Sequence, residues 1–250
     1  MRVLLIFLIS TVQAYGFTLL SLAPPKYNKP NEIKVNVTSD GCSNAGVSAQ
    51  RLLDLAMLAV EEYWNSVETA NIEFIEGEIT NFTGAGQSFD SLLNDARTLG
   101  DGNVLVGCST NISATAAAVG GSGGNNQIAY GAVVMKNSAV NFNRGEEISI
   151  AILAHEMGHV LGLGHSRNEI ALMDSSGGAI GLNKLTQDDR NGATFLYPYE
   201  SDPGSCWSSL GTIEDVDGPG GSPMNFLFSL LLGLLGVIAL KAKKFKLRSF

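Results

Sequence analysis

Hydrophobic and polar positions along the chain fall into segments that predict strands and helices in turn. Residues 32–38 alternate with a period of two, as a half-buried strand does, and residues 71–79 and 102–106 predict two further strands. Residues 46–67 carry apolar side chains at helical spacing, with charged side chains off that stripe. They predict an amphipathic helix that covers one face of a sheet.

The second half of the body predicts two more strands and a buried helix. The strands are expected at residues 112–119 and 127–135, joined by a turn or loop at the Gly-Gly-Ser-Gly-Gly string of residues 120–124. Residues 146–161 are apolar almost all the way round. The helix that they predict must therefore be buried in the domain.

The start of the chain has the pattern of a secretory signal peptide. Within residues 1–16, Arg2 precedes a short apolar run and small residues that suit cleavage. We therefore expect an exported protein whose folded domain covers residues 31–198.

The end of the chain has the pattern of a membrane anchor. Residues 199–222 are dominated by Gly, Pro, Ser and Asp and predict a linker, residues 223–240 predict a transmembrane segment, and residues 241–250 predict a basic cytoplasmic tail. The succession also resembles the Gly-Gly type of C-terminal sorting signal of bacterial exported proteins, whose tail is cut by a membrane protease. A permanent single-pass anchor and a processed, cell-surface protein both remain open.

Composition narrows the class of protein. The chain has 250 residues, 45% of them hydrophobic, and a formal net charge of −8, which excludes a disordered chain and argues against a nucleic-acid partner. Export implies an oxidising compartment, so two of Cys42, Cys108 and Cys206 are expected to pair. We favour Cys42 with Cys108, because each follows a predicted strand; the other pairings and free thiols stay open.

All three histidines of the chain lie in the stretch His-Glu-Met-Gly-His-Val-Leu-Gly-Leu-Gly-His. His155 and His159 stand four residues apart and share one helix face. Gly162 can adopt the positive φ that ends a helix, so that the chain turns back and His165 supplies a third nitrogen. Three neutral nitrogen ligands predict a catalytic zinc with its fourth position open.

Glu156 is expected to act as general base on the metal-bound water and to carry the proton to the leaving amine. Two other interpretations stay open: three histidines satisfied within the core, and a non-catalytic zinc site completed by Asp174 or Cys206.

The pattern H-E-x-x-H-x-x-G-x-x-H, followed by a methionine in a turn, resembles the metzincin metalloproteases. Ser166, Ala-Leu-Met at residues 171–173, and Leu-Thr-Gln-Asp-Asp at residues 185–189 are similar to the matrixin branch. The resemblance implies an α+β domain with a mixed, mostly parallel five-stranded sheet, a backing helix, a buried active-site helix and a C-terminal helix.

The resemblance also implies roles for single residues. Met173 would form the hydrophobic base of the zinc site, and Asp188 and Asp189 would support the Met-turn and the domain's N-terminal region. Local chemistry offers a second reading, since Thr186 and Asp189 form a capping box at a helix start. Substrate peptides are expected to bind as an added strand at the sheet edge within residues 112–119. Calcium is common in the family, although no calcium-loop pattern is visible.

The sequence departs from the matrixin pattern after Met173, where Asp174 and a Ser-Ser-Gly-Gly string replace the usual proline and aromatic residue. No histidine remains for the family's second zinc. Together the motifs predict an exported zinc endopeptidase that acts on proteins or peptides and is held at the membrane by its C-terminal helix. The alternative is a membrane-anchored, zinc-stabilised binding or adhesion module with a vestigial protease motif.

Overall fold

A computed structural model describes residues 16–113, 116–125, 129–175 and 185–199. Within these residues the strands are β1 (Ile33–Val37), β2 (Phe74–Ile79), β3 (Asn103–Ser109), β4 (Ala118–Gly124) and β5 (Ala129–Lys136). The helices are α1 (Ala49–Glu62), α2 (Phe89–Leu99), α3 (Ala139–Phe142), α4 (Glu146–Leu161) and α5 (Gln187–Leu196), with 3-10 helices η1 (Ser43–Ala45) and η2 (Trp64–Ser66).

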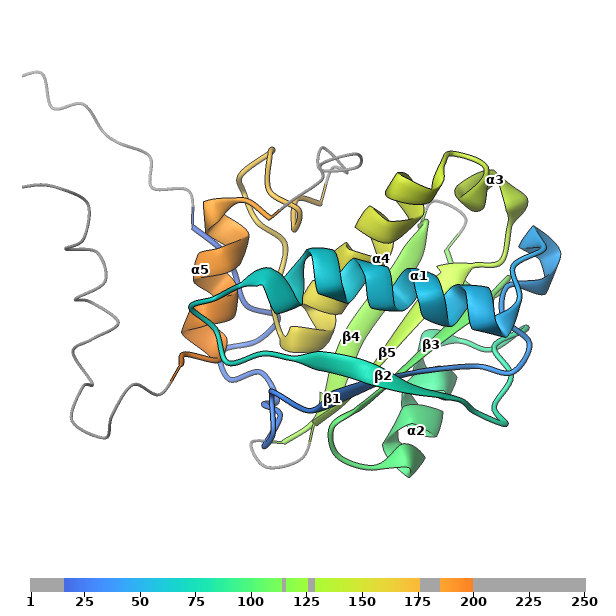
Figure 1. Cartoon of the computed structure of the whole chain (residues 1–250), viewed down its shortest axis with the longest axis horizontal. Helices are drawn as coiled ribbons and strands as arrows, with labels where there is room; N and C mark the ends of the chain where they lie inside the picture. Colours follow the sequence, from blue (N-terminus) through green and yellow to red (C-terminus); the bar gives the residue numbers. More distant parts are fainter. Residues whose placement is uncertain (1–15, 114–115, 126–128, 176–184, 200–250) are drawn as a thin grey trace, which may run out of the picture. The chain divides into compact units, whose positions relative to one another are not determined.

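The strands form one sheet in the order β2-β1-β3-β5-β4 (Figure 1). Neighbouring strands run parallel from β2 to β5, and β4 pairs antiparallel with β5. The mixed, mostly parallel five-stranded sheet is therefore confirmed. β4 forms one edge of the sheet, beside the strand that follows it in the chain.

Helices cover both faces of the sheet. α1 packs against α4 and the strands β1 to β3, and α2 packs on β3, β4 and β5 from the other side (Figure 1). At the start of α1 the Ser48 side chain accepts a hydrogen bond of 3.2 Å from the Arg51 main-chain nitrogen, which caps the helix. Leu52, Ala56 and Val60 are fully buried. Burial of a large aliphatic side chain contributes about 1.5–3 kcal/mol, so this stripe fixes α1 on the sheet.

The glycine-rich string is a strand, and here the prediction from sequence was wrong. β4 includes all of residues 120–124, predicted as a loop, and only the last two residues of the strand predicted at 112–119. A Cβ atom at Gly121 would lie 3.1 Å from the Phe89 ring, and one at Gly123 would lie 2.7 Å from the Tyr130 ring. Side chains of α2 and β5 therefore cover a strand that has almost none of its own, and hydrophobic periodicity cannot reveal this.

α2 was also absent from the predicted elements. Its N-terminal residue is preceded by Ser88, whose side chain accepts a hydrogen bond of 3.2 Å from the main-chain nitrogen of Ser91. The helix buries Leu92 and Ala96 against Leu105 and Val134 of the sheet. Phe89, Leu93 and Leu99 are partly buried against the same cluster, so the segment does have an amphipathic helical pattern, which the predicted elements left out.

Cys42 and Cys108 form a disulfide. Cys42 lies just beyond β1 and Cys108 lies in β3, and these strands are parallel neighbours in the sheet. Both cysteines are fully buried. This is the pair that the sequence favoured, and Cys206 lies outside the described residues.

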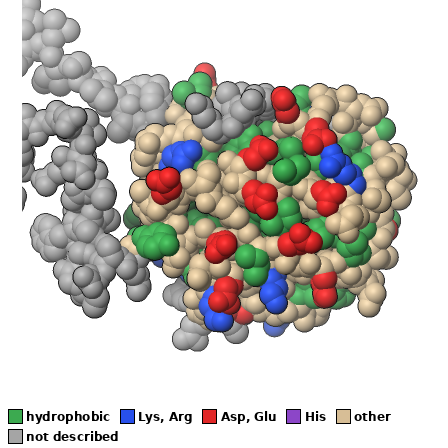
Figure 2. All heavy atoms as spheres, in the orientation of Figure 1, with side chains coloured by type: hydrophobic (Ala, Val, Ile, Leu, Met, Phe, Trp, Pro, Cys, Tyr) green, Lys and Arg blue, Asp and Glu red, His purple; other side chains and the backbone are tan. Residues whose placement is uncertain are grey.

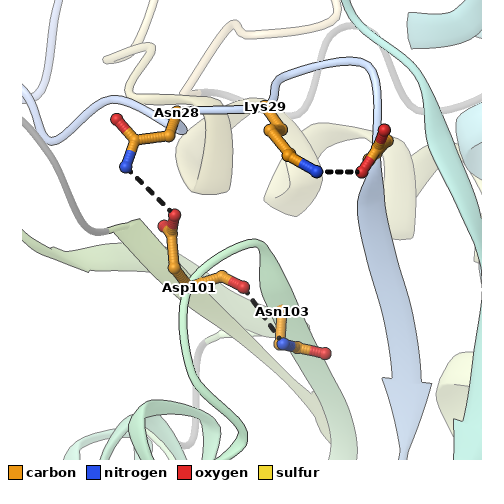
Figure 3. Close-up of polar contacts among 5 residues, drawn as sticks. Asn28, Lys29, Asp101 and Asn103 are labelled. Atoms are coloured by element: carbon orange, nitrogen blue, oxygen red, sulfur yellow. Dashed lines mark hydrogen bonds and ion pairs between the residues drawn. The ribbon is translucent and has the colours of Figure 1, made fainter.

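Asp101, in the connection between α2 and β3, joins three parts of the chain (Figure 3). Its carboxylate accepts hydrogen bonds from Asn28 Nδ2 (3.3 Å) and from the Ala129 main-chain nitrogen (2.8 Å). Its main-chain carbonyl accepts a further bond from Asn103 Nδ2 (3.2 Å). The segment that leads into β1 is thereby tied to the beginnings of β3 and β5.

Acidic side chains are spread over the face that α1 and β2 form (Figure 2). This agrees with the excess of Asp and Glu over Lys and Arg in the sequence. Within the described part of the chain, none of the helices has the length and apolar character needed to cross a membrane. Two predicted regions lie outside the described residues. They are residues 1–15 of the leader, and everything beyond residue 199, which comprises the linker, the anchor and the basic tail.

Candidate metal centre

α4 supplies two of the three histidines and is almost wholly buried, as its sequence predicted. The helix ends at Gly162, which has a φ of 103° and donates its N–H to the carbonyls of Gly158 and His159. A Cβ atom there would also lie 2.8 Å from Pro24 Cβ. Left-handed backbone and close packing both require glycine, so the predicted turn after the helix is confirmed.

The turn brings His165 back to the two histidines of α4. Ring nitrogens of His155, His159 and His165 lie within 4.8 Å of one another, and the Nε2 atoms of His159 and His165 are 3.2 Å apart. Within the described residues, His, Cys, Asp and Glu side chains form no second group of three or more that could bind one ion. No group of acidic side chains suited to calcium is therefore found in this part of the chain. Asp174 is not part of the group, and Cys206 lies outside the described part of the chain.

Hydrogen bonds fix the orientation of two of the rings. Nδ1 of His155 lies 2.6 Å from the Leu172 carbonyl, and Nδ1 of His159 lies 2.8 Å from the Leu163 carbonyl. Because a carbonyl only accepts, Nδ1 carries the hydrogen in each ring, and Nε2 keeps the lone pair that binds a metal. The two tautomers are therefore those of metal ligands.

Burial also keeps these rings neutral. It lowers the pKa of His155 from the ordinary value of 6.5, with the bond to Leu172 opposing. It lowers the pKa of His159 to about 4, an effect to which charge on His155 adds. Neutral imidazoles are the form that binds zinc. A donor set of three imidazole nitrogens fits a zinc ion with one position left for water or substrate.

Glu156 is buried in α4 directly after the first histidine. Burial raises the pKa of its carboxyl to about 7, and a hydrogen bond from the Gly120 main chain acts in the opposite direction. A nearby bound cation would lower that pKa from there. A Cβ atom at Gly120 would lie 2.5 Å from the Glu156 carbonyl oxygen, so the edge strand β4 lies directly against the helix at this residue. Sequence reasoning did not find Gly120, because nothing local marks a long-range backbone contact.

Met173 packs against α4, and its role as the hydrophobic base of the zinc site stays a prediction. It is 2% exposed, and a Cβ atom at Gly158 would collide with its sulfur. Trp64 closes the same region: its Nε1 donates a hydrogen bond of 2.8 Å to the Ala154 carbonyl. The small residue in the helix thus permits the close approach of the turn that carries Met173.

Asp189 holds that turn. Its carboxylate accepts hydrogen bonds from the main-chain nitrogens of Leu172 and Met173, both at 3.0 Å. The same carboxylate accepts from the main-chain nitrogen and the hydroxyl of Thr186, at 2.9 and 2.7 Å, at the start of α5. The same carboxylate therefore completes the capping box and supports the Met-turn.

Asp188 acts on the other side of the turn. It accepts a hydrogen bond of 2.5 Å from the hydroxyl of Ser166, the residue after the third histidine. The main-chain nitrogen of Ser166 in turn donates to the Met173 carbonyl at 2.8 Å. Both aspartates predicted as supporting residues thus contact the segments that carry His165 and Met173.

The fold and the three-histidine centre define a metzincin-like metallopeptidase domain. A model of the matrixin family of peptidases matches residues 58–198, more than half of the chain, and the chain belongs to this family. No curated protein matches the sequence. The crystal structure of metalloproteinase-II from Bacteroides fragilis aligns with 75% of this chain at 15% identity and a TM-score of 0.43. The chain covers 60% of the length of that structure.

Proposed function

We propose that this chain is an exported zinc endopeptidase in which His155, His159 and His165 hold the metal and Glu156 is the general base. One observation carries the proposal: ring nitrogens of the three histidines lie within 4.8 Å of one another, and the residue after the first of them in α4 is a buried glutamate whose carboxyl pKa burial raises to about 7. Membership of a peptidase family supports the same activity and a peptide substrate.

Each residue of the site has a defined task in hydrolysis. A bound zinc ion supplies Lewis-acid chemistry, which makes water a nucleophile at neutral pH and polarises the scissile carbonyl. Glu156 takes the proton from the attacking water and delivers it to the amide nitrogen as the C–N bond breaks. Burial raises the pKa of this carboxyl and a bound cation would lower it again, so the group would accept the water proton and then return it to the leaving amine. The main-chain N–H of Gly120 orients this carboxyl.

A substrate peptide would add as a strand along β4, the edge strand next to Glu156. The expected binding edge thereby moves from residues 112–119 to Ala118–Gly124. Glycines at this edge expose main-chain groups, so the edge would recognise the peptide backbone rather than its side chains.

The location of the enzyme is part of the proposal. The leader at residues 1–16, the apolar segment 223–240 and the basic residues 241–250 indicate export and a C-terminal anchor whose end stays in the cytoplasm. The disulfide between Cys42 and Cys108 suits an oxidising compartment. The Gly-Pro-Gly-Gly-Ser-Pro segment favours a second form of this proposal, in which a sorting protease cuts the tail.

The catalytic proposal is tested with Glu156→Gln, using an unfolded protein as substrate. The variant is expected to bind one zinc ion, measured by elemental analysis, and to lose cleavage by about 10²–10⁴-fold. Glu147→Gln, a change on the exposed side of the same helix, is the matched control and should cleave normally. A chelator should stop the wild type, and added zinc should restore it.

Two outcomes would contradict this assignment. Cleavage by Glu156→Gln at the wild-type rate would show that another group is the base. A zinc-loaded wild type that cleaves no unfolded protein would instead support the binding module. For the tail, mass spectrometry of the exported protein decides, and an intact Phe250 terminus would rule out processing.

A further inference from the structure

Residues 18–20, here named the N-terminal strap, pair with the loop that leads from α4 to the third histidine. The main-chain nitrogen of Leu20 donates to the Gly162 carbonyl at 3.0 Å, and that of Gly164 donates to the Thr18 carbonyl at 2.8 Å. Between them, Leu19 and Leu163 form an antiparallel bridge. A segment at the opposite end of the domain sequence therefore satisfies the backbone of this loop.

The strap also contacts His165 itself. The hydroxyl of Thr18 donates a hydrogen bond of 2.6 Å to the His165 main-chain carbonyl. His155 and His159 are fixed from within the helix and by bonds from their ring nitrogens to carbonyls. His165 is exposed and lies beyond the helix end, so its backbone is the part that the protein holds.

Close packing keeps the strap in place. A Cβ atom at Gly164 would lie 2.5 Å from the Thr18 hydroxyl oxygen and 2.9 Å from the Leu19 carbonyl oxygen. Next to the strap, the Phe17 ring lies 5.4 Å from the Phe195 ring of α5, centroid to centroid. Figure 1 shows this first described segment, in blue, running along α5. The strap thus packs directly against the loop that leads to the third histidine.

We propose that the N-terminal strap positions the third zinc ligand, with Thr18 as the positioning residue. The inference rests on the zinc site of the proposed function. Groups that orient metal ligands without touching the metal typically change metal affinity by about 10–100-fold. The leader boundary predicted at residue 16 leaves the strap intact, whereas cleavage beyond Thr18 would remove part of the zinc site.

The test compares Thr18→Val, which removes the hydroxyl at nearly constant volume, with Thr18→Ser, which keeps it, in the full chain. Thr98→Val is the control, because the Thr98 hydroxyl likewise donates to a main-chain carbonyl, that of Asp95 at 2.7 Å, away from the histidines. Zinc affinity is measured by competition with a chelator, and the metal geometry by the visible absorption of the cobalt-substituted protein. Thermal unfolding without metal reports the structural effect alone.

We expect Thr18→Val to bind zinc about 10–100-fold more weakly and to alter the cobalt spectrum, while Thr18→Ser stays near the wild type. Both valine variants should have similar metal-free unfolding temperatures. Wild-type zinc affinity and an unchanged cobalt spectrum in Thr18→Val would overturn the proposal. These readouts do not involve cleavage, so they stand apart from the test of Glu156.

Gly164→Ala offers a second, independent disturbance, because its methyl group would push the strap off the loop. It should weaken zinc binding in the same direction as Thr18→Val. If both substitutions act through the strap, the loss of zinc affinity in the double variant will be smaller than the product of the two single losses. Fully multiplicative effects would contradict a shared cause.

Discussion

The carboxylate of Asp189 lies 3.0 Å from the main-chain nitrogen of Met173 and accepts a hydrogen bond from it. Asp189 is 1% exposed, and the residues it binds belong to two separate segments, the Met-turn and the start of α5. One buried carboxylate therefore joins the turn that carries Met173 to the last helix of the described domain. Replacement of a single oxygen should disturb both.

We expect Asp189→Asn to lower the free energy of unfolding by about 2–4 kcal/mol, since hydrogen bonds to charged groups contribute about 1.5–3 kcal/mol each and the amide places a donor against main-chain N–H groups. Urea unfolding of the metal-free protein measures this. Asp90→Asn, in the first turn of α2 and exposed, is the control and should change stability by less than about 1 kcal/mol. Equal stability of the two variants would contradict the bridging role.

Gly120→Ala should impair the catalytic site more than the fold. The new methyl group would meet the backbone of α4 at Glu156, which cannot move aside easily. We expect kcat/KM to fall by about tenfold to a hundredfold, as displacements of about 1 Å do in other active sites. Gly121→Ala is the control in the same strand, because its methyl group meets only the Phe89 ring, which can shift. Similar activity of the two variants would show that the approach of β4 to Glu156 is not critical.

Loss of the disulfide should cost considerable stability. The bond between Cys42 and Cys108 spans a sequence separation of 66 residues, and a loop of that length corresponds to about 4 kcal/mol in the chain-entropy model. The double variant Cys42→Ala/Cys108→Ala is expected to unfold at lower urea concentration, as the wild type should with a reductant. The reductant should have no further effect on the double variant. The double variant keeps only Cys206, so an effect of the reductant on it would show that the reductant acts by a route other than the bond between Cys42 and Cys108.

Alkaline pH should destabilise the domain through two buried tyrosines. Burial raises the pKa of Tyr27 and of Tyr197 well above the ordinary value of 10.0. Below pH 10 both phenols are protonated in the folded and unfolded states. Above pH 10 the unfolded chain loses these protons and the folded protein keeps them, so the free energy of unfolding falls with rising pH.

Each tyrosine should contribute about 1.4 kcal/mol per pH unit in this range. Urea unfolding between pH 8 and 11 measures the slope, and Tyr197→Phe should make it shallower. The same variant should lose about 1 kcal/mol at pH 7, because the Tyr197 hydroxyl donates to the Leu161 carbonyl at 3.1 Å. Tyr27→Phe should not lose stability, since within the described structure the Tyr27 hydroxyl has no hydrogen-bond partner. An unchanged alkaline slope in both variants would refute this origin.

Features that depend on short stretches of sequence could be predicted well. The spacing of His155 and His159, the helix end at Gly162 and the capping box of Thr186 and Asp189 are all encoded within a few residues. The buried helix from residue 146 to 161 was predicted with its observed bounds, because its apolar character extends around the whole helix. The α+β class followed from the family resemblance carried by the same motif.

Features that depend on contacts between distant segments could not be predicted in this way. The glycine string of β4 has no alternation of its own, and it becomes a strand because β5 pairs with it and Phe89 and Tyr130 cover it. The strap contact between Thr18 and His165 joins residues 147 positions apart. No local pattern marks either contact.

The sequence by itself predicted the three candidate metal ligands, the proposed general base and the helix that carries His155 and His159, because helical geometry places residues four apart on one face. Only the tertiary structure decided how the third histidine is held, which strand lies against Glu156, and that Asp189 serves two segments at once. Those relationships arise when separate elements satisfy one another's buried backbone groups, a condition that exists only in the folded chain.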